Sequence, residues 1–422
     1  MHIFMVTNSP GEVMGWVKPA AERLKEKQKE TIITVVIPPC QYASGMEDKV
    51  AEEIPAVDSV VGPSQYLKYL FLGSRPSSFR QAKKGVIVFL GGDPFHALLL
   101  SKRLKLPAVA YIQNLRWKRY FKRFMVLSET IRERFIARGA KEEKVVVVGD
   151  LAKDGMRVKM SAKETFNYWG LAPGYLVISF LPGSRPEEIR YMTPFFLKAA
   201  ELIKKEFPSS QFLVILSPFV SKKELNAVNE ESLSKTFSGV GAKLKKESGQ
   251  WKLITKSGLK ALVIEEKRYE AINISHLIIT IPGTSTLEST YLGTPMVVAI
   301  PLNKPEAIPL DGLAGLVGGL PIIGSLIKRQ MVKQYSKRIK FAAIPNIRAE
   351  REIVPEIRGI IEPADVAKEV IGLLRSPGRL TEMKEELRKI ARTTEGAANK
   401  VADIILEIGA KCISCTLHLI CL

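Results

Sequence analysis

Two short segments carry the residues best suited to chemistry, Leu181–Arg185 (LPGSR) and Pro282–Glu288 (PGTSTLE). Each follows an apolar run typical of a buried strand, Tyr175–Phe180 and His276–Ile281, and each precedes a helical pattern. A turn of small residues at such a place presents unpaired backbone N–H groups and the positive end of the helix dipole, which suit a phosphate. Two such turns in one domain predict a diphosphate at the carboxyl ends of a parallel sheet.

The side chains of the two segments fit the same kind of ligand. Arg185 would neutralise phosphate charge, and Glu288 is placed to accept hydrogen bonds from ribose hydroxyls. For Gly183 and Gly283 the alternative is a tight turn with no ligand. The first functional question is therefore which nucleotide binds.

The elements that must position these residues alternate between strand and helix patterns. The apolar runs that predict strands are Ile3–Val6, Ile32–Ile37, Val57–Val61, Val86–Leu90, Ala108–Ile112, Met125–Leu127 and Val145–Val148, and after about residue 160 Leu176–Phe180, Phe212–Leu216, Leu262–Ile264, Leu277–Ile281 and Met296–Ile300. Amphipathic stretches lie between them, which is typical of doubly wound parallel sheets. Since 422 residues are too many for one ordinary core, we expect an α/β protein of two Rossmann-like domains facing a cleft.

The segments between and after these strands are less regular. Ser238–Gln250, rich in Gly, Lys and Ser, is expected to be a surface excursion. Three helical patterns close the chain, Pro363–Leu374, Leu380–Ala391 and Ala397–Ile408.

The composition is that of a folded protein with an unusual charge. Hydrophobic residues make up 46% and charged residues 25%, but the formal net charge is +20. Such a field favours a polyanion, an anionic membrane face or acidic substrates, and the alternative is a solvated basic surface. The N-terminus lacks the basic start of an export signal, no unbroken apolar run reaches about 20 residues, and the four cysteines argue against a disulfide framework. We therefore expect a cytoplasmic protein.

Ile308–Ile327 contains a single charged residue, Asp311, and is followed by a run of Lys and Arg from Lys328 to Lys340. Its glycines and prolines disfavour a spanning helix, so the pattern favours an apolar flap that enters a membrane interface. The alternative is an inter-domain or homodimer contact.

Arg116–Arg123 interleaves basic residues with Trp117, Tyr120 and Phe121. Aromatic residues among basic ones occur in single-stranded nucleic-acid sites and at lipid headgroups, or form a plain solvated surface. We expect no nucleic-acid partner because no nucleic-acid module surrounds the patch.

The last residues hold Cys412, Cys415, His418 and Cys421. One short segment cannot easily wrap tetrahedrally around zinc, so a frayed or docked apolar tail is favoured over a metal site.

Taken together, these segments resemble the lipid-A-disaccharide synthases. The resemblance spans nearly the whole chain, up to about Gly409. Leu181–Ile189 is similar to the family's L-P-G-S-R-x-x-E-[IV], Gly283–Glu288 to G-T-A-T-L-E, Pro295–Val298 to C-P-M-V-V, and Ile344–Glu352 to L-P-N-L-L-A-G-R-E. The resemblance implies a GT-B fold and transfer of an acylated glucosamine from UDP to a lipid-linked sugar. It also implies an acceptor domain over residues 1–160, a UDP-sugar domain over 161–378, helices 379–409 packed back on the first domain, and a tail at 410–422.

The first domain departs from the family pattern. The family's G-E-x-S-G-D is here Gly11–Trp16 (GEVMGW), and its G-x-D-x-P-D-F-N is Gly91–His96 (GGDPFH), with one Asp lost and His96 at the Asn position. We therefore place Gly11 and Met14 on the acceptor side and expect an altered acceptor or acyl preference.

The resemblance and the turns together imply roles for the site residues. The diphosphate would be held by the turn residues Gly183, Ser184, Arg185, Gly283, Thr284, Ser285 and Thr286, with Asn346 on the diphosphate, Glu288 on the ribose and Arg351 in support. No metal or other cofactor is expected, since no DxD pair follows a strand.

Three residues are candidates for the base that removes the acceptor proton, Asp93, His96 and Glu12. Their alternatives are a helix N-cap for Asp93, a half-buried helix residue for His96 and a partner of a helix dipole for Glu12.

The function expected from these features is inverting transfer of a glucosamine-type sugar from a UDP-sugar donor to a lipid-linked acceptor. The enzyme would lie on the anionic inner face of the plasma membrane. The partners considered also include a second copy of the chain, in a homodimer. The alternatives are a GT-B transferase with a polyprenyl or glycerolipid acceptor and a non-catalytic nucleotide-sugar binder.

Overall fold

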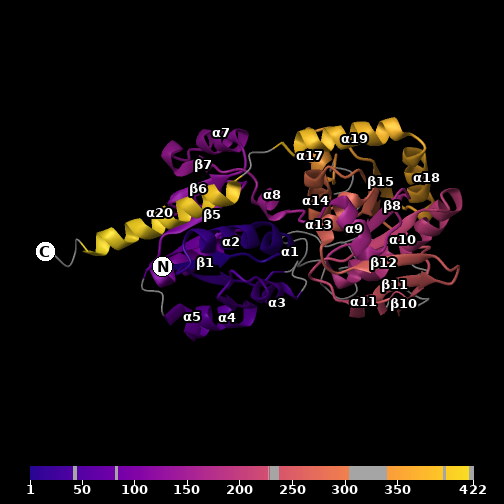
Figure 1. The fold of residues 1–422 in the computed structure, drawn as a ribbon. Coiled ribbons are helices and arrows are strands. Elements are labelled where there is room, and N and C mark those ends of the chain that lie inside the picture. The colour runs from indigo at the N-terminus through magenta and orange to yellow at the C-terminus, as the bar shows by residue number, and fades with distance from the viewer. Residues whose placement is uncertain are drawn as a thin grey trace, which may run out of the picture. The chain divides into compact units, whose positions relative to one another are not determined.

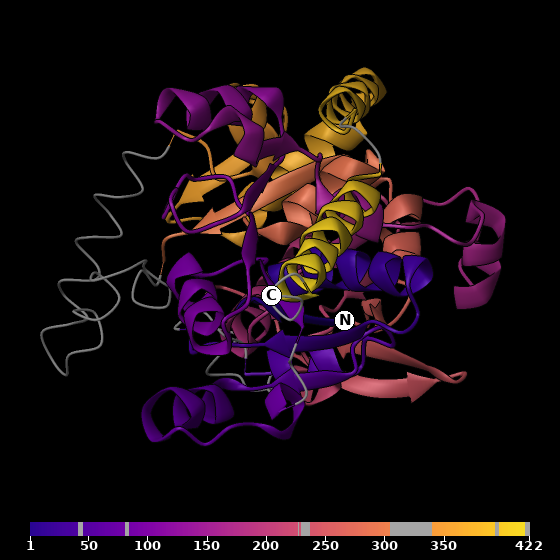
Figure 2. The same ribbon diagram turned by 90° about the vertical axis from the view of Figure 1, so that its left-hand side faces the viewer.

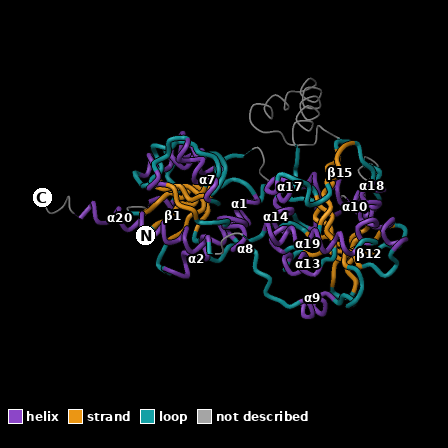
Figure 3. Tube along the Cα trace, turned by 90° about the horizontal axis from the view of Figure 1, so that it is seen from above, coloured by secondary structure: helices purple, strands orange, loops and turns teal. Residues whose placement is uncertain are grey.

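The structure, a computed structural model, describes residues 1–40, 45–80, 84–226, 228, 237–303, 340–392 and 396–417, with only the backbone for 411–417. The chain forms two compact units (Figure 1). Unit 1 comprises Met1–Gly155 and the C-terminal helix, and unit 2 comprises Met156–Arg392. In each unit the strands form one layer with helices packed around it (Figure 3), which confirms two Rossmann-like α/β domains.

Unit 1 has a parallel sheet of seven strands in the order β3-β2-β1-β4-β5-β6-β7. The strands are β1 (His2–Val6), β2 (Ile32–Val36), β3 (Ser59–Val61), β4 (Gly85–Phe89), β5 (Ala108–Tyr111), β6 (Arg123–Val126) and β7 (Val145–Val147). The helices are α1 (Pro10–Glu12), α2 (Lys18–Lys27), α3 (Glu47–Glu52), α4 (Pro63–Leu72), α5 (Ser77–Arg80), α6 (Pro94–Leu104), α7 (Glu129–Ala137), α8 (Leu151–Gly155) and α20 (Ala397–Leu417). All seven predicted strands are present, because strands covered on both faces have continuous apolar sequences.

Unit 2 has an eight-stranded sheet in the order β10-β11-β12-β9-β8-β13-β14-β15. The strands are β8 (Val177–Leu181), β9 (Gln211–Ile215), β10 (Ala242–Glu247), β11 (Gln250–Thr255), β12 (Lys260–Ile264), β13 (Leu277–Thr280), β14 (Met296–Pro301) and β15 (Glu356–Gly359). The helices are α9 (Ala162–Trp169), α10 (Pro186–Glu206), α11 (Lys222–Asn226), α13 (Arg268–Ile274), α14 (Thr284–Leu292), α17 (Ile344–Ala349), α18 (Pro363–Leu374) and α19 (Pro377–Ile390). β10 to β12 pair antiparallel, so the expected excursion at Ser238–Gln250 contains an edge strand instead.

The C-terminal helix belongs to unit 1. It packs on α2 and β4, and Figure 2 shows it in yellow against the indigo N-terminal segment. The carboxylate of Asp154 accepts hydrogen bonds from the N–H groups of Gly396 (3.2 Å) and Ala398 (2.7 Å), which fixes the start of α20. We expected the helices from residue 379 onward to pack on the first domain. That boundary is too early, because α19 packs on α14, α17 and α18 of unit 2.

Three expectations fall on residues of which little or nothing is described. The apolar flap at Ile308–Ile327 lies outside the described residues, as do His418 and Cys421, and the side chains of Cys412 and Cys415 are likewise not described. Within the described ranges, no helix is long and apolar enough to cross a membrane.

Candidate functional site

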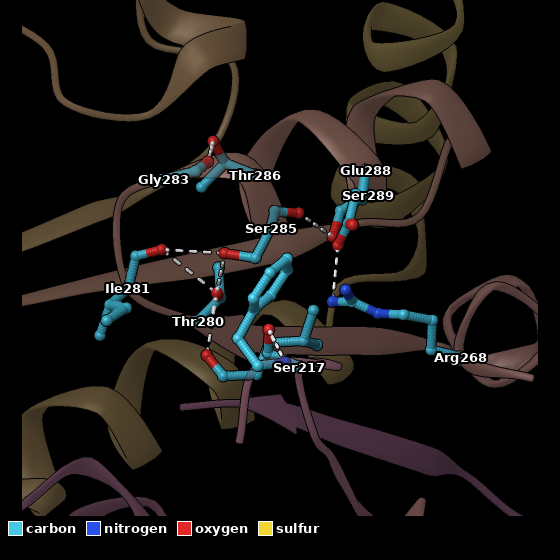
Figure 4. Close-up of polar contacts among 11 residues, drawn as sticks. Ser217, Arg268, Thr280, Ile281, Gly283, Ser285, Thr286, Glu288 and Ser289 are labelled. Carbon is cyan, nitrogen blue, oxygen red and sulfur yellow. Dashed lines mark hydrogen bonds and ion pairs between the residues drawn. The ribbon is translucent and has the colours of Figure 1, made fainter. Parts of the chain in front are cut away.

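The two small-residue turns of unit 2 are neighbours. β8 and β13 pair in parallel register, Leu181 beside Thr280, so the turns that follow them leave the same edge of the sheet. The Thr280 hydroxyl joins the turns, since its Oγ1 lies 3.1 Å from the carbonyl oxygen of Leu181 and 2.8 Å from the hydroxyl of Ser285 (Figure 4). This is the edge at which open α/β sheets bind ligands.

The turn before α14 is open. Gly283 has φ +140°, a conformation that only glycine adopts readily, and Gly283 and Thr284 are exposed. Among the described residues, no atom lies within 4 Å of the position that a Cβ of Gly283 would take, and no acceptor faces the N–H of Thr284 or Ser285. Thr286 stabilises the turn from below, because its hydroxyl donates to the Gly283 carbonyl (2.8 Å) and lies 3.2 Å from the N–H of Ile344. The geometry therefore offers an anion the free N–H groups of a nine-residue helix.

The turn before α10 is already occupied by a carboxylate of the chain itself. Oε2 of Glu188 accepts the N–H groups of Ser184 (2.7 Å) and Arg185 (3.1 Å), and Oε1 pairs with the Arg185 guanidinium at 2.6 Å. Gly183 has φ +133°, and a Cβ there would stand 2.3 Å from Oε2, so glycine is required for the carboxylate to fit. In this arrangement Ser184 and Arg185 donate to Glu188 and not to a ligand.

Glu288 lies beneath the open turn in a buried ion pair. Its side chain is 4% exposed, and Oε2 lies 2.8 Å from the guanidinium of Arg268, which is 15% exposed (Figure 4). Burial raises the pKa of Glu288 above its ordinary value, and Arg268 opposes that shift. The Nε of Arg268 is buried without an acceptor among the described residues. Glu288 is thus fixed by Arg268, and only a movement of this pair would expose it to a ribose.

The side-chain amide of Asn346 uses its hydrogen-bonding positions within the protein, so none is left for a diphosphate. Its Nδ2 donates to the carbonyl of Val354 (2.8 Å) and to Glu356 (2.9 Å), and its Oδ1 accepts the N–H groups of Ile353 (2.7 Å) and Val354 (2.9 Å). The residue is fully buried and holds the loop between α17 and β15 in place. The structure therefore corrects its expected diphosphate contact. Arg351 is exposed and pairs with Glu386 of α19.

In unit 1, Glu12 connects two turns at the carboxyl edge of the first sheet. Its Oε1 accepts the N–H of Gly92 (3.0 Å) from the turn after β4, and its Oε2 accepts the N–H of Asn8 (3.3 Å) and the hydroxyl of Thr7 (3.3 Å). A Cβ on Gly91 would stand 2.0 Å from the Glu12 carboxyl carbon. Burial raises the pKa of Glu12, against the opposing effect of these hydrogen bonds.

Asp93 is the N-cap of α6. Its Oδ1 accepts the N–H of Phe95 (2.9 Å), Pro94 occupies the first helical position, and Oδ2 lies 3.2 Å from the Arg116 guanidinium. The two carboxylate oxygens thus have helix-capping and ion-pair roles, as the N-cap alternative expects.

His96 lies one turn into α6. Its Nδ1 is 2.9 Å from the hydroxyl of the buried Tyr66, and among the described residues Nε2 makes no hydrogen bond. Burial lowers the pKa of His96, and Asp93 opposes the shift. Burial also raises the pKa of Tyr66, which therefore keeps its proton. The lowered pKa favours the neutral imidazole at pH 7, and Nε2 can accept a proton in the tautomer whose Nδ1–H donates to the Tyr66 hydroxyl.

The residues expected on the acceptor side, Gly11 and Met14, are half-buried, Gly11 in α1 and Met14 in the π-helical segment Val13–Val17 that follows it. The departure at Trp16 has a structural partner, because its ring packs edge-on against Tyr111 with 5.3 Å between centroids.

Two residues of this site were not predicted with the roles they have. Arg268 begins α13, and the signal was a basic residue shortly after β12, a strand of the same sheet as β13, which precedes the helix that carries Glu288. Glu188 follows Arg185 by three residues, which is the capping-box spacing. No group of three or more metal-ligating side chains occurs in the described part of the chain.

A family model described as lipid-A-disaccharide synthetase matches residues 144–243, which include β8 and the Glu188 turn. The lipid-A-disaccharide synthase of Geobacter sulfurreducens is 26% identical over 270 residues, 63% of this chain and 58% of that protein. The lipid-A-disaccharide synthase 2 of Legionella pneumophila is 26% identical over 248 residues, 58% of this chain and 51% of that protein. Over these stretches the chain is similar to the lipid-A-disaccharide synthases. It spans less than two thirds of the length of these relatives.

Solved structures are similar to this chain in fold. The UDP-GlcNAc 2-epimerase of Neisseria meningitidis, bound to UDP-GlcNAc, matches with a TM-score of 0.54 at 17% identity, over 97% of this chain and 100% of that one. A putative UDP-N-acetylglucosamine 2-epimerase of Listeria monocytogenes matches with a TM-score of 0.50 at 11% identity, over 96% and 94% of the two chains. At this identity the likeness shows the two-domain fold alone.

Proposed function

We propose that the chain is a glycosyltransferase that moves a glucosamine-type, acylated sugar from UDP to a lipid-linked acceptor with inversion at the sugar. The observation that carries the proposal is the open N-terminus of α14, at Gly283–Thr286, within a chain that is similar to lipid-A-disaccharide synthases. The free N–H groups and the helix dipole would stabilise the departing diphosphate without a metal ion.

The donor side would use unit 2. The diphosphate would lie against Gly283, Thr284 and Ser285, and the Arg185 guanidinium of the neighbouring turn would add positive charge only on leaving its pair with Glu188. Glu288 would meet the ribose only if the Arg268 pair shifts, since the carboxylate is buried in this conformation.

The base would come from unit 1. Of the three candidates, His96 has the geometry that fits best, because it is neutral at pH 7 and its Nε2 makes no hydrogen bond among the described residues. Asp93 already caps α6 and pairs with Arg116, and both oxygens of Glu12 accept hydrogen bonds.

The acceptor and the cellular place follow from the same resemblance. Gly11 and Met14 would face a lipid-linked sugar, and the departures around them fit a changed acceptor or acyl chain. A basic chain of net charge +20 fits a peripheral protein on an anionic inner membrane face. A second copy of the chain is a further proposed partner, and sedimentation would test for this homodimer.

The competing function is a nucleotide-sugar binder without turnover. The observation that favours it is the departure of the first domain, where Met14 and Trp16 replace the Ser and Asp of the family pattern.

The experiment is a transfer assay with UDP-activated acylated glucosamine and detergent-dispersed lipid-linked sugar phosphates, read by mass spectrometry. We expect a disaccharide product and release of UDP that depends on the acceptor. UDP binding without product from sugar-phosphate, polyprenyl or glycerolipid acceptors would favour the binder. Product with a polyprenyl or glycerolipid acceptor alone would move the chain to a different acceptor class.

A further inference from the structure

Unit 1 carries three exposed aromatic rings at the carboxyl edge of its sheet, which we call the aromatic ledge: Phe95, Trp117 and Tyr120. Their exposed fractions are 47%, 43% and 65%. The rings are neighbours, with 6.1 Å between the centroids of Phe95 and Trp117 and 6.2 Å between those of Trp117 and Tyr120. Three adjacent exposed aromatic rings are uncommon on a protein that has no partner for them.

The ledge is held in an ordered turn. The N–H of Tyr120 donates to the carbonyl of Trp117 at 3.0 Å, and the next residue, Phe121, is fully buried. Trp117 has φ +54°, a left-handed conformation that is rare for a bulky side chain. Such strain persists where the surroundings impose it and occurs most often at functional positions.

The ledge lies in a stretch of one charge sign. From Pro94 to Ser128 the sequence has eight Lys and Arg residues and no Asp or Glu. Arg116, Lys118, Arg119 and Lys122 are exposed around the rings. Arg116 pairs with Asp93, and Lys118 donates to the carbonyl of Arg138 (3.1 Å) at the end of α7, which leaves Arg119 and Lys122 with no ion-pair partner among the described residues.

We infer that the aromatic ledge docks into the headgroup layer of an anionic lipid bilayer. Trp and Tyr rings favour the membrane–water interface, and the surrounding Lys and Arg residues favour its negative surface. The ledge is next to the candidate base, since Phe95 precedes His96 and their ring centroids are 6.1 Å apart. Docking would therefore bring the acceptor edge of unit 1 to the layer that holds a lipid-linked sugar. The choice of a bilayer as the occupant rests on the proposed function.

The test is sedimentation of the full chain with vesicles of phosphatidylcholine alone and with 30% phosphatidylglycerol (about one lipid in three, a strongly anionic surface). We expect binding to the anionic vesicles that weakens as salt rises. Trp117→Ser/Tyr120→Ser should weaken it about tenfold or more, whereas Tyr175→Ser, which removes a ring 46% exposed in unit 2, should change it less than about twofold. UDP affinity should stay the same in all three proteins.

Arg119→Glu/Lys122→Glu provides a second variant in case the aromatic variant does not fold, because both side chains are exposed. We expect it to abolish the preference for anionic vesicles while the thermal unfolding midpoint is retained. Unchanged vesicle binding in a folded ledge variant would overturn the inference, and so would tight binding of oligo-dT that the anionic vesicles cannot displace. Vesicle binding without UDP binding would refute the proposed function and would support the docking role of the aromatic ledge. UDP binding without vesicle binding would support the proposed function and would overturn the docking role.

Discussion

The carboxylate of Glu188 takes the place of a ligand at the backbone N–H of Ser184, with 2.7 Å between Oε2 and the nitrogen. The same oxygen accepts the N–H of Arg185 at 3.1 Å. Two turns that look equivalent in the sequence therefore differ in the structure, because one is occupied by its own helix and the other is open. This difference favours the turn at Gly283 for the proposed anion-binding role.

Replacing Glu188 tests this difference. Glu188→Gln should lower the free energy of unfolding by about 1–2 kcal/mol, since a charged acceptor at a helix N-terminus is lost. It should not weaken UDP binding, because the carboxylate competes with a diphosphate for the same N–H groups. Urea unfolding and calorimetry measure the two effects. Glu187→Gln is the control, as that side chain is exposed, and equal stability of the two variants would contradict the capping role.

The Arg268–Glu288 pair should be costly to break from one side. Arg268→Leu leaves a buried carboxylate without its cation, so we expect a loss of about 3–5 kcal/mol in the free energy of unfolding. Arg268→Leu/Glu288→Leu should lose less, because no buried charge is left over. The exposed pair of Arg375 and Glu206 is the control, where Arg375→Leu should cost at most about 1 kcal/mol. A double variant less stable than the single one would show that the pair is not the cause.

The residue that removes the acceptor proton can be identified from variants that lose turnover but keep their UDP affinity. His96→Gln should reduce kcat by about 100-fold or more with unchanged UDP affinity, if His96 accepts the acceptor proton. Asp93→Asn should mainly lower stability, by about 1 kcal/mol, since its main contact is the helix cap. Because burial lowers the pKa of His96, kcat/KM should fall only below the ordinary histidine range and stay level up to pH 8. Full activity of His96→Gln beside an inactive, folded Asp93→Asn would reverse the assignment.

A buried histidine makes the stability of unit 1 depend on acid. His2 is 3% exposed, its Nε2 lies 2.7 Å from the Thr34 hydroxyl, and burial lowers its pKa to about 4 from an ordinary 6.5. The unfolded chain therefore binds the proton more readily, so stability is complete above pH 6.5 and falls as the pH drops toward 4. The slope from this group approaches about 1.4 kcal/mol per pH unit. Urea unfolding of His2→Leu between pH 7 and 4 should show a shallower fall than the wild type, and parallel curves would exclude His2 as the cause.

Much of the fold follows from the sequence because buried parallel strands are continuous apolar runs. All seven strands of unit 1 were predicted in this way. β10 was not, because it is an edge strand whose only apolar residues are Ala242 and Leu244, and its other four residues are Lys or Glu. β15 is short and half-buried along its length, so it gives no comparable signal.

The site was predictable to the level of its turns and not of its contacts. Glycine turns after strands located Gly183 and Gly283 correctly at one sheet edge. That Asn346 serves its own loop could not be inferred, because its partners Ile353 and Val354 lie in an irregular segment and Glu356 begins the short strand β15. The flap at Ile308–Ile327 remains a prediction from composition alone.

Whether the open turn at Gly283 binds the diphosphate of UDP is tested by calorimetry. The wild type and Gly283→Ala are titrated with UDP, and with ADP and GDP as selectivity controls. A Cβ at Gly283 would stand on the open face of the turn and strain its φ of +140°. Gly359→Ala is the matched control, with φ +129°, no atom within 4 Å of the Cβ position among the described residues, and a place two strands away. We expect UDP-selective binding that Gly283→Ala weakens about tenfold or more and Gly359→Ala changes less than about twofold. Equal affinity of the wild type for UDP, ADP and GDP, or a folded Gly283→Ala variant that binds UDP as the wild type does, would contradict this expectation.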